Sequence, residues 1–408
     1  MEESVRYAVG VDVGTENVRA VVLSLTKGGE VSVVGYNEGK NAGMRKGVLA
    51  NLAGPADAID KILGEVERMS GYEIHQATVS INGAQILTTK TEGMIAVGTA
   101  EHEINEEDLY RVEDVAVTGR VPANREILDV IPFGYSIDGQ EEVQDPIGMT
   151  GARLELKANV VSALQPNSTN LKKALEGAKL QVERLVPSVV AGARSVLDEK
   201  QKENGVAIVD LGAATTSVAV YEEGELQYVG VVPAGSNNIT NDLAICLEIN
   251  TEIAEEIKKR HVTGSFSGEK DVVIKVNREE LTFAREQVDE VVRARLEEIF
   301  EKVKKELRKA GYEKRLPEGA VLVGGGAKMR DIEVFAKGAL EMSVKIGAPK
   351  ELGGVGNAIE KPEYAAAVGL AFLSAEGEAR GVAREGKRKA KQNGGGGFFS
   401  GLLKKFKF

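Results

Sequence analysis

The 408-residue sequence predicts an α/β protein in which two similar domains face each other across a cleft. Two stretches, 7–25 and 205–226, share one order: an apolar strand, an aspartate, a glycine-containing turn and a second apolar strand. A third stretch, 319–340, runs from an apolar strand through three consecutive glycines into a helical pattern. Because the first pattern recurs about 200 residues along the chain, we expect a duplicated fold.

The two hairpin stretches are candidate phosphate sites. Backbone N–H groups in such turns form concave sites for phosphate oxygens, and glycine lets the phosphate come close. Asp12 precedes the first turn and Asp210 the second, and each can hold Mg²⁺ through water, because Mg²⁺ keeps most of its hydration shell. A single hairpin of this kind favours an ordinary turn, whereas the pair favours a phosphate site. The predicted binding residues are Gly14, Thr15, Glu16 and Asn17 in the first hairpin and Gly212, Ala213, Ala214, Thr215 and Thr216 in the second.

The third stretch, GAVLVGGGAKMRDIEVFAKGAL, predicts a strand ending at Val323 and a helix from Met329 to Leu340. Its glycines have no side chains, so a flat base or ribose could lie against the backbone. The same glycines are also compatible with a tight strand-to-helix turn that binds nothing. The binding residues expected here are Gly324, Gly325, Gly326, Ala327 and Met329.

Composition excludes several classes of protein. One cysteine, Cys246, rules out a disulfide framework, and three separated histidines predict no metal cluster. The net charge is −10, yet residues 377–408 carry nine Lys or Arg and only two Glu, so the acidic charge lies in the preceding body. An acidic body is not typical of a nucleic-acid binder, which needs a basic patch on its folded surface. The sequence predicts neither a signal peptide nor a transmembrane helix.

The last eleven residues, FFSGLLKKFKF, follow four glycines that would serve as a flexible linker. On a helical wheel the apolar residues Phe398, Phe399, Leu402, Leu403 and Phe406 fall within an arc of roughly 140°. Lys404, Lys405 and Lys407 lie outside this arc, as does Phe408. A cationic helix with one apolar face suits an anionic membrane surface. Taken alone, the pattern is also compatible with a helix that docks on its own domain, although the linker argues against that.

Together these motifs resemble the actin, sugar-kinase and chaperone ATPase superfamily, and within it the sequence is similar to the FtsA family of bacterial cell-division proteins. The resemblance covers nearly the whole chain, including VSINGAQI at 79–86, EILDVIPFGYSIDGQEEVQDPIGMTGARLEL at 126–156, VPAGSNNITNDLA at 232–244, VKIGAPKEL at 344–352 and EYAAAVGLAFL at 363–373. It implies an actin-like two-domain ATPase fold that binds ATP and Mg²⁺. In the helix ending AEEIKKRH, Glu255 and Lys258 stand where relatives contact the ribose and base.

The resemblance also implies a division of the chain. Residues 1–83 and 162–198 would form the first nucleotide domain, with a helix at 55–69, and residues 199–236 and 320–376 the second. Residues 84–161 would be the inserted subdomain of the FtsA type, in which Asn105 caps a helix. Residues 237–319 would be an inserted helical subdomain, 377–397 a flexible linker and 398–408 an amphipathic membrane helix.

A member of this family would polymerise, through residues 84–161, and would tether the FtsZ ring to the cytoplasmic side of the cell membrane as a peripheral protein. Its inserted helical subdomain would bind the acidic, apolar C-terminal tail of FtsZ. We expect the longest helix there, from about Glu279 to Ala310, with an apolar face formed by Leu281, Val288, Val292, Leu296, Ile299, Val303 and Leu307. Its Arg285, Arg293 and Arg295 are candidates for the FtsZ carboxylates, since guanidinium pairs carboxylates bidentately. The alternative is an ordinary solvated face.

The sequence departs from the superfamily at two places. Relatives often have further glycines after the second aspartate, where this chain has Ala213 and Ala214. Chaperone and MreB relatives place a glutamate near the attacking water, where this chain has Val186. Because valine cannot polarise or position water, we expect hydrolysis to be slow at most.

Two other functions share this fold. A small-molecule kinase would need a carboxylate base and a sugar pocket in the cleft, and a pilus-assembly protein such as PilM should lack the membrane helix. The C-terminal tail therefore separates the tethering function from both alternatives.

Overall fold

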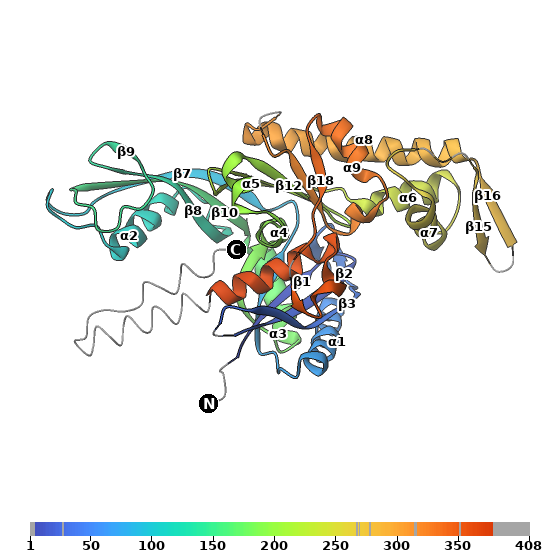
Figure 1. The fold of residues 1–408 in the computed structure, drawn as a ribbon, viewed down its shortest axis with the longest axis horizontal. Helices are drawn as coiled ribbons and strands as arrows, with labels where there is room; N and C mark the ends of the chain where they lie inside the picture. The colour runs from blue at the N-terminus through green and yellow to red at the C-terminus, as the bar shows by residue number, and fades with distance from the viewer. Residues whose placement is uncertain are drawn as a thin grey trace.

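The computed structural model describes residues 5–377, except 27, 267, 269, 277, 278, 314, 315 and 351. The predicted membrane helix at 398–408 and the predicted linker beyond residue 377 lie outside the described residues. Two sheets form the body, and a third sheet and a group of helices extend from it in opposite directions (Figure 1).

The first domain is built on a six-stranded sheet with the order β11-β6-β1-β2-β3-β19. Its strands are β1 (Arg6–Val13), β2 (Asn17–Leu25), β3 (Val31–Lys40), β6 (Gln76–Ile81), β11 (Gln181–Pro187) and β19 (Gly353–Gly354). Valine-rich runs make β1 and β2 buried on both faces, as expected for central strands. The helix α1 (Ala53–Ser70) packs on β2 and β3, and α3 (Gln165–Gly177) packs on α1 and β11. A final helix at 365–377 contacts β1 so closely that a methyl group at Gly10 would lie 2.3 Å from the carbonyl oxygen of Ala367.

The second domain repeats this design in a five-stranded sheet with the order β14-β13-β12-β17-β18. Its strands are β12 (Val206–Leu211), β13 (Thr216–Glu222), β14 (Glu225–Val232), β17 (Ala320–Val323) and β18 (Val344–Ile346). In each sheet three consecutive strands form an antiparallel meander, β1-β2-β3 in the first and β12-β13-β14 in the second. The first strand of each meander also pairs with a parallel strand, β6 or β17. That strand pairs with a further parallel strand, β11 or β18. The predicted duplication is therefore confirmed. The helix α4 (Ser188–Val196) contacts strands of both sheets and joins the two domains.

The inserted sheet lies at one end of the molecule and has the order β7-β10-β8-β9 (Figure 1). It comprises β7 (Leu87–Ala96), β8 (Arg125–Ile137), β9 (Gln140–Val143) and β10 (Arg153–Leu164), with α2 (Glu106–Val117) on one face. Asn105 caps α2 as predicted: its side chain accepts a hydrogen bond from the backbone N–H of Glu107, and Asp108 bonds back to the Asn105 N–H.

Helices from the second domain extend toward the opposite end, where the β15–β16 hairpin lies (Figure 1). They are α6 (Ser236–Cys246), α7 (Thr251–His261) and α8 (Arg285–Ala310), and the hairpin strands are β15 (Val272–Val276) and β16 (Glu279–Phe283). The predicted start of the long helix at Glu279 is wrong. Leu281 lies in β16 opposite Ile274. The helix was predicted to include it because a residue seven positions before Val288 fits the helical spacing by coincidence. The other six predicted apolar residues of α8 are buried.

The remaining elements are short. They are β4 (Met44–Arg45), β5 (Val48–Leu49), α5 (Glu199–Asn204), α9 (Ile332–Leu340) and the 3₁₀ turns η1 (Gly325–Lys328), η2 (Gly356–Ile359) and η3 (Pro362–Tyr364). The helix predicted from Met329 begins three residues later, at Ile332. Met329 has extended backbone and Asp331 a left-handed φ of 58°, so helical geometry cannot start before Ile332.

Candidate functional site

A cavity of about 600 Å³ lies between the two domains. Both hairpin turns, the glycine turn after β17 and helix α7 contribute to its walls. Of the residues predicted to bind nucleotide or metal, those that line it are Asp12, Gly14, Thr15, Glu16, Asn17, Asp210, Gly212, Ala213, Thr215, Glu255, Lys258, Gly324, Gly325, Gly326 and Met329. The structure thus brings together residues that are up to about 300 positions apart in the sequence.

Three predicted binding residues do not line the cavity. The hydroxyl of Thr216 is turned into the sheet, where it donates to the carbonyl oxygen of Ala234 at 2.8 Å. Ala327 belongs to the core of the second domain. Ala214 lies in the second turn without reaching the cavity wall.

The two hairpins have the same backbone geometry. The N–H of Gly14 donates to the carbonyl oxygen of Asn17 at 3.0 Å, and the N–H of Gly212 donates to that of Thr215 at 3.0 Å. A methyl group at either glycine would lie 2.8 Å from the same carbonyl oxygen. Glycine is therefore required for this tight turn at both positions.

Asp12 and Asp210 lie at the floor of the cavity, at the end of β1 and β12. Burial raises the pKa of Asp12, and this effect outweighs the charge of Arg19, its cross-strand partner, which lowers that pKa. Burial and the nearby charge of Asp12 raise the pKa of Asp210 to about 6. The hydroxyl of Ser188 donates to Asp210 Oδ2 at 2.8 Å. Two carboxylates that repel each other in a polar cavity are suited to a cation.

The donor set fits Mg²⁺ rather than a metal held entirely by protein. Within the described residues, no three His, Cys, Asp or Glu side chains gather closely enough to hold a metal ion. Two carboxylates would leave most coordination positions to water and phosphate oxygens, as Mg²⁺ prefers.

The glycine turn passes directly over Asp210. Gly324 has φ +87°, and a methyl group there would lie 2.3 Å from Asp210 Oδ1. A methyl group at Gly326 would lie 2.4 Å from Leu211 Cγ, whereas at Gly325 it would meet nothing within 4 Å. The first and third glycines are therefore required for packing, and the second leaves an open surface.

Glu255 and Lys258 form an ion pair on α7, with 2.6 Å between Lys258 Nζ and Glu255 Oε2. Thr240 on α6 binds both: its hydroxyl donates to Glu255 at 2.5 Å and accepts from Lys258 at 2.9 Å. Burial would raise the pKa of Glu255, but the hydrogen bonds from Lys258 and Thr240 outweigh it and hold that pKa below its usual range. Burial lowers the pKa of Lys258 despite this partner. Both groups are thus fixed in position at the cavity wall.

Glu16 connects the two sides of the cavity. It forms an ion pair with Lys40 in its own domain and accepts a hydrogen bond at 3.3 Å from the side chain of Asn237, at the start of α6 in the second domain. The Lys40 hydrogen bond holds the pKa of Glu16 below its usual value. The Glu16 side chain therefore joins the first domain to α6 of the second at the cavity wall.

Sequence reasoning missed several residues that line the cavity. They include Arg19, Glu38, Lys40, Asn82, Ser188, Ser236, Asn237, Lys259, Lys328 and Glu363. The G-S-N-N stretch at 235–238 carried a usable signal, because a glycine and three polar residues between an apolar strand and a helix are typical of a helix N-terminus. The backbone N–H of Ser236 donates to Gly212 O at 2.9 Å, which ties this helix start to the second hairpin.

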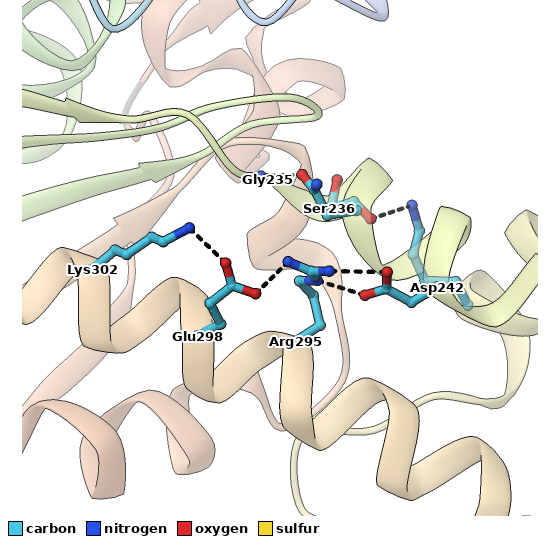
Figure 2. A network of polar contacts seen from close by, with 8 residues as sticks. Gly235, Ser236, Asp242, Arg295, Glu298 and Lys302 are labelled. Atoms are coloured by element: carbon cyan, nitrogen blue, oxygen red, sulfur yellow. Dashed lines mark hydrogen bonds and ion pairs between the residues drawn. The ribbon is translucent and has the colours of Figure 1, made fainter. Parts of the chain in front are cut away.

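Of the three arginines predicted to contact a partner, Arg285 and Arg293 lie on one side of α8, and Arg295 faces α6. Arg295 donates to the carboxylate of Asp242 on α6 from Nε at 2.5 Å and from Nη2 at 2.9 Å, and its Nη1 pairs with Glu298 (Figure 2). Arg293 stacks over the ring of Phe266 at 4.2 Å. Arg285 donates to the carbonyl oxygen of His261 at 2.8 Å. Each arginine thus has an intramolecular role.

The predicted membrane residues, Phe398, Phe399, Leu402, Leu403, Lys404, Lys405, Phe406 and Lys407, all lie outside the described residues. Among the helices that the structure does describe, none has the length and apolarity needed to cross a bilayer.

The duplicated sheets, the cavity between their hairpins and the extra four-stranded insert define an actin-like two-domain fold. Two family models match the chain: "Cell division protein FtsA" over residues 207–369 and "SHS2 domain inserted in FTSA" over residues 83–162. The chain belongs to the FtsA family of cell-division proteins, since it is 35% identical to FtsA of Pseudomonas aeruginosa over 93% of its own length and 92% of that protein. It is also 32% identical to FtsA of Bacillus subtilis (89% and 82% covered) and 31% identical to FtsA of Escherichia coli K12 (94% of both).

Solved structures with the same fold are more distant. A chain of the PilM-PilN type IV pilus biogenesis complex aligns with a TM-score of 0.66 at 18% identity, covering 90% of this chain and 98% of that one. The ethanolamine utilization protein EutJ from Carboxydothermus hydrogenoformans gives 0.52 at 21% identity, with 90% and 89% covered. MreB5 of Spiroplasma citri gives 0.50 at 13% identity, with 89% and 94% covered. These similarities to solved structures show the fold alone. The FtsA relatives show the family, which is therefore FtsA rather than the PilM-like or small-molecule kinase alternatives.

Proposed function

We propose that this chain is an ATP-binding adaptor of cell division that polymerises and tethers FtsZ to the inner face of the cytoplasmic membrane. The cavity is the observation that supports nucleotide binding, because two glycine turns with the same backbone hydrogen bond and two aspartates converge there from opposite domains. MreB5 of Spiroplasma citri, which shares the fold, was solved bound to ADP, and this supports a nucleotide as the ligand.

In this proposal Asp12 and Asp210 hold Mg²⁺ through water, and the two hairpins hold the phosphates. Glu255, Lys258 and the glycine turn face the ribose and base. Bound Mg²⁺ would neutralise the phosphates and relieve the repulsion between the two carboxylates.

Calorimetric titration with ATP, with and without Mg²⁺, tests this site. Asp12→Ala and Asp210→Ala should each weaken Mg²⁺-dependent binding markedly, and Asp60→Ala, an exposed residue on α1, should not. ATP binding that is untouched by both cavity substitutions would exclude the assignment.

We propose that self-association uses residues 84–161. The sheet, α2 and one loop of this segment carry several large apolar side chains that are more than one-third exposed: Met94, Tyr110, Val115, Ile127, Phe133 and, in the loop between β9 and β10, Ile147. Met94→Glu should abolish ATP-dependent pelleting while ATP binding persists. Val334→Glu on α9 is the matched control, since Val334 is 58% exposed and Met94 57%. Equal pelleting by the two variants would place the contact elsewhere.

Attachment to lipid is assigned to residues 398–408. Partial burial of five apolar side chains contributes about 5–8 kcal/mol, and each lysine near anionic lipid adds on the order of 1 kcal/mol. We expect Phe399→Glu to release the protein from anionic liposomes in a flotation assay, and Phe408→Glu, outside the apolar arc, to matter less. Equal losses would indicate a generic sticky tail, and no loss would indicate docking on protein.

For the FtsZ tail, the inserted helical subdomain at 237–319 remains the proposed site. Arg285 and Arg293 both act on the pKa of Asp289, so they lie on one side of α8, whereas Arg295 faces α6. Arg293→Glu should weaken binding of an acidic FtsZ-tail peptide, measured by fluorescence anisotropy. Arg308→Glu, a charge reversal near the other end of α8, is the control. Equal peptide affinities of the two variants would show that the site lies elsewhere.

A further inference from the structure

Residues 41–50 form a short loop that contains β4 and β5 and lies against the first phosphate hairpin. The side chain of Asn41 donates to the carbonyl oxygen of Gly14 at 2.7 Å, and its backbone N–H donates to that of Glu16 at 2.9 Å. Further along the loop, the N–H of Gly47 donates to the hydroxyl oxygen of Thr15 at 3.1 Å. This 41–50 loop thus fixes both the backbone and the side chain of the first turn.

Gly47 also lies close to the second hairpin. It is buried and has φ +78°, and a methyl group there would lie 3.2 Å from the methyl carbon of Thr215. On its other side the same methyl group would lie 2.9 Å from the Cα and N atoms of Gly83. Gly47 is therefore enclosed between the backbone at Gly83 and the turn of the second domain, and only glycine fits without displacing one of them.

The chemistry of a hydroxyl gives this contact a consequence. A threonine hydroxyl has one proton to donate and two lone pairs to accept. When Gly47 N–H occupies a lone pair of Thr15, the oxygen is held in place and its single proton stays available to an acceptor in the cavity that Thr15 lines. A phosphate oxygen is such an acceptor, and hydrogen bonds to charged groups are among the stronger ones.

We propose that Gly47 is a positioning residue for the terminal phosphates of the nucleotide: its N–H orients the Thr15 hydroxyl, and its lack of a side chain lets the Thr215 turn approach the Thr15 turn. This inference rests on the proposed nucleotide site. It predicts that a substitution at Gly47 weakens binding of the phosphates but does not affect binding of the base, which lies at the other wall of the cavity in that proposal.

The test measures the affinities for Mg·ATP and for AMP, which has no β- or γ-phosphate, in the full chain. Gly47→Ala should weaken ATP binding about tenfold or more, the effect of losing one hydrogen bond to a charged group, and leave AMP affinity within about twofold. Gly71→Ala is the matched control, because Gly71 has φ +68° but nothing within 4 Å of an added methyl group. It carries the same backbone strain and should leave both affinities unchanged.

Thr15→Val provides a second variant without backbone strain. If Gly47 acts through the Thr15 hydroxyl, the losses from Gly47→Ala and Thr15→Val will not add in the double variant. Additive losses, equal losses of ATP and AMP affinity, or an unchanged ATP affinity in Gly47→Ala would each overturn the inference. Failure of the unsubstituted protein to bind ATP would instead refute the proposed nucleotide site itself.

Discussion

Replacing Asp210 by asparagine is expected to stabilise the metal-free protein while it removes Mg²⁺-dependent nucleotide binding. Asparagine at this position would keep the size of the side chain, and its amide oxygen can still accept the hydrogen bond that Ser188 donates to Oδ2. The substitution therefore removes mainly the negative charge that faces Asp12.

The magnitude follows from the raised pKa of Asp210, about 6 in the folded protein against an ordinary 3.8, caused first by burial and then by the charge of Asp12. Each pKa unit corresponds to about 1.4 kcal/mol, so ionised Asp210 lowers the free energy of unfolding by on the order of 2–3 kcal/mol. A carboxyl with a raised folded pKa favours the folded state fully at low pH, and that contribution is lost as the pH rises from about 4 through 6. The gain from Asp210→Asn should therefore be full above pH 7 and absent near pH 4.

Thermal unfolding from pH 4.5 to 8, in EDTA, measures this effect. At pH 8 the variant should unfold about 3–4 °C above the unsubstituted protein, and the difference should shrink toward zero as the pH falls toward 4. Mg·ATP should raise the unfolding temperature of the unsubstituted protein and leave Asp210→Asn nearly unchanged. Asp60→Asn, at an exposed position on α1, is the control and should have no effect. A variant that is less stable at pH 8, or whose gain does not depend on pH, would refute the argument from carboxylate repulsion.

Three further outcomes are expected. Gly324→Ala should abolish ATP binding and destabilise the protein, because its methyl group would lie 2.3 Å from Asp210 Oδ1, whereas Gly325→Ala meets nothing within 4 Å and should be tolerated; comparable unfolding temperatures and affinities for the two would contradict the packing argument. Arg295→Ala should lower the free energy of unfolding by about 1 kcal/mol in urea denaturation, since it removes a partly exposed bidentate pair with Asp242. An Asp242→Ala variant with an unchanged free energy of unfolding would show that the pair does not contribute to stability. ATP hydrolysis should be well below about 1 s⁻¹, because the buried Val186 offers no group that could position the attacking water; rapid phosphate release would disprove this.

The sequence predicted the architecture because duplicated patterns leave few arrangements. Two apolar hairpins with the same order of aspartate and glycine already indicated two sheets, and the observed strand orders are equivalent. Element boundaries were less predictable where one residue fits both the helical spacing and the strand spacing. Leu281 fits both a helix extended backward from Val288 and a strand opposite Ile274, and only its pairing in the folded chain decides between them.

At the candidate site, residues carried by glycine turns were predictable and residues that arrive from elsewhere were not. Asp12 and Asp210 come at the end of apolar strand patterns, so their place at the carboxyl ends of the central strands β1 and β12 could be expected. Ser188 and Asn237 start helices whose direction relative to the cavity depends on how α4 and α6 pack. A single sequence contains no distance between such elements, which is why the contact of Asn237 with Glu16 could not be foreseen.

The alanines that follow Gly212 show which glycines the fold needs. Relatives often have glycine where this chain has Ala213 and Ala214. In the structure the steric demand for glycine falls on Gly212, 2.8 Å from a carbonyl oxygen if a methyl were added, and on Gly235, whose methyl would lie 2.7 Å from Ala213 O. The backbone of the turn is held by N–H groups from the start of α6, including that of Asn237, which donates to Ala213 O at 2.7 Å. Backbone contacts of this kind do not depend on the side chains at 213 and 214. The second hairpin therefore keeps the geometry of the first with two methyl groups in place, and the departure from the superfamily pattern changes the surface of the turn rather than its shape.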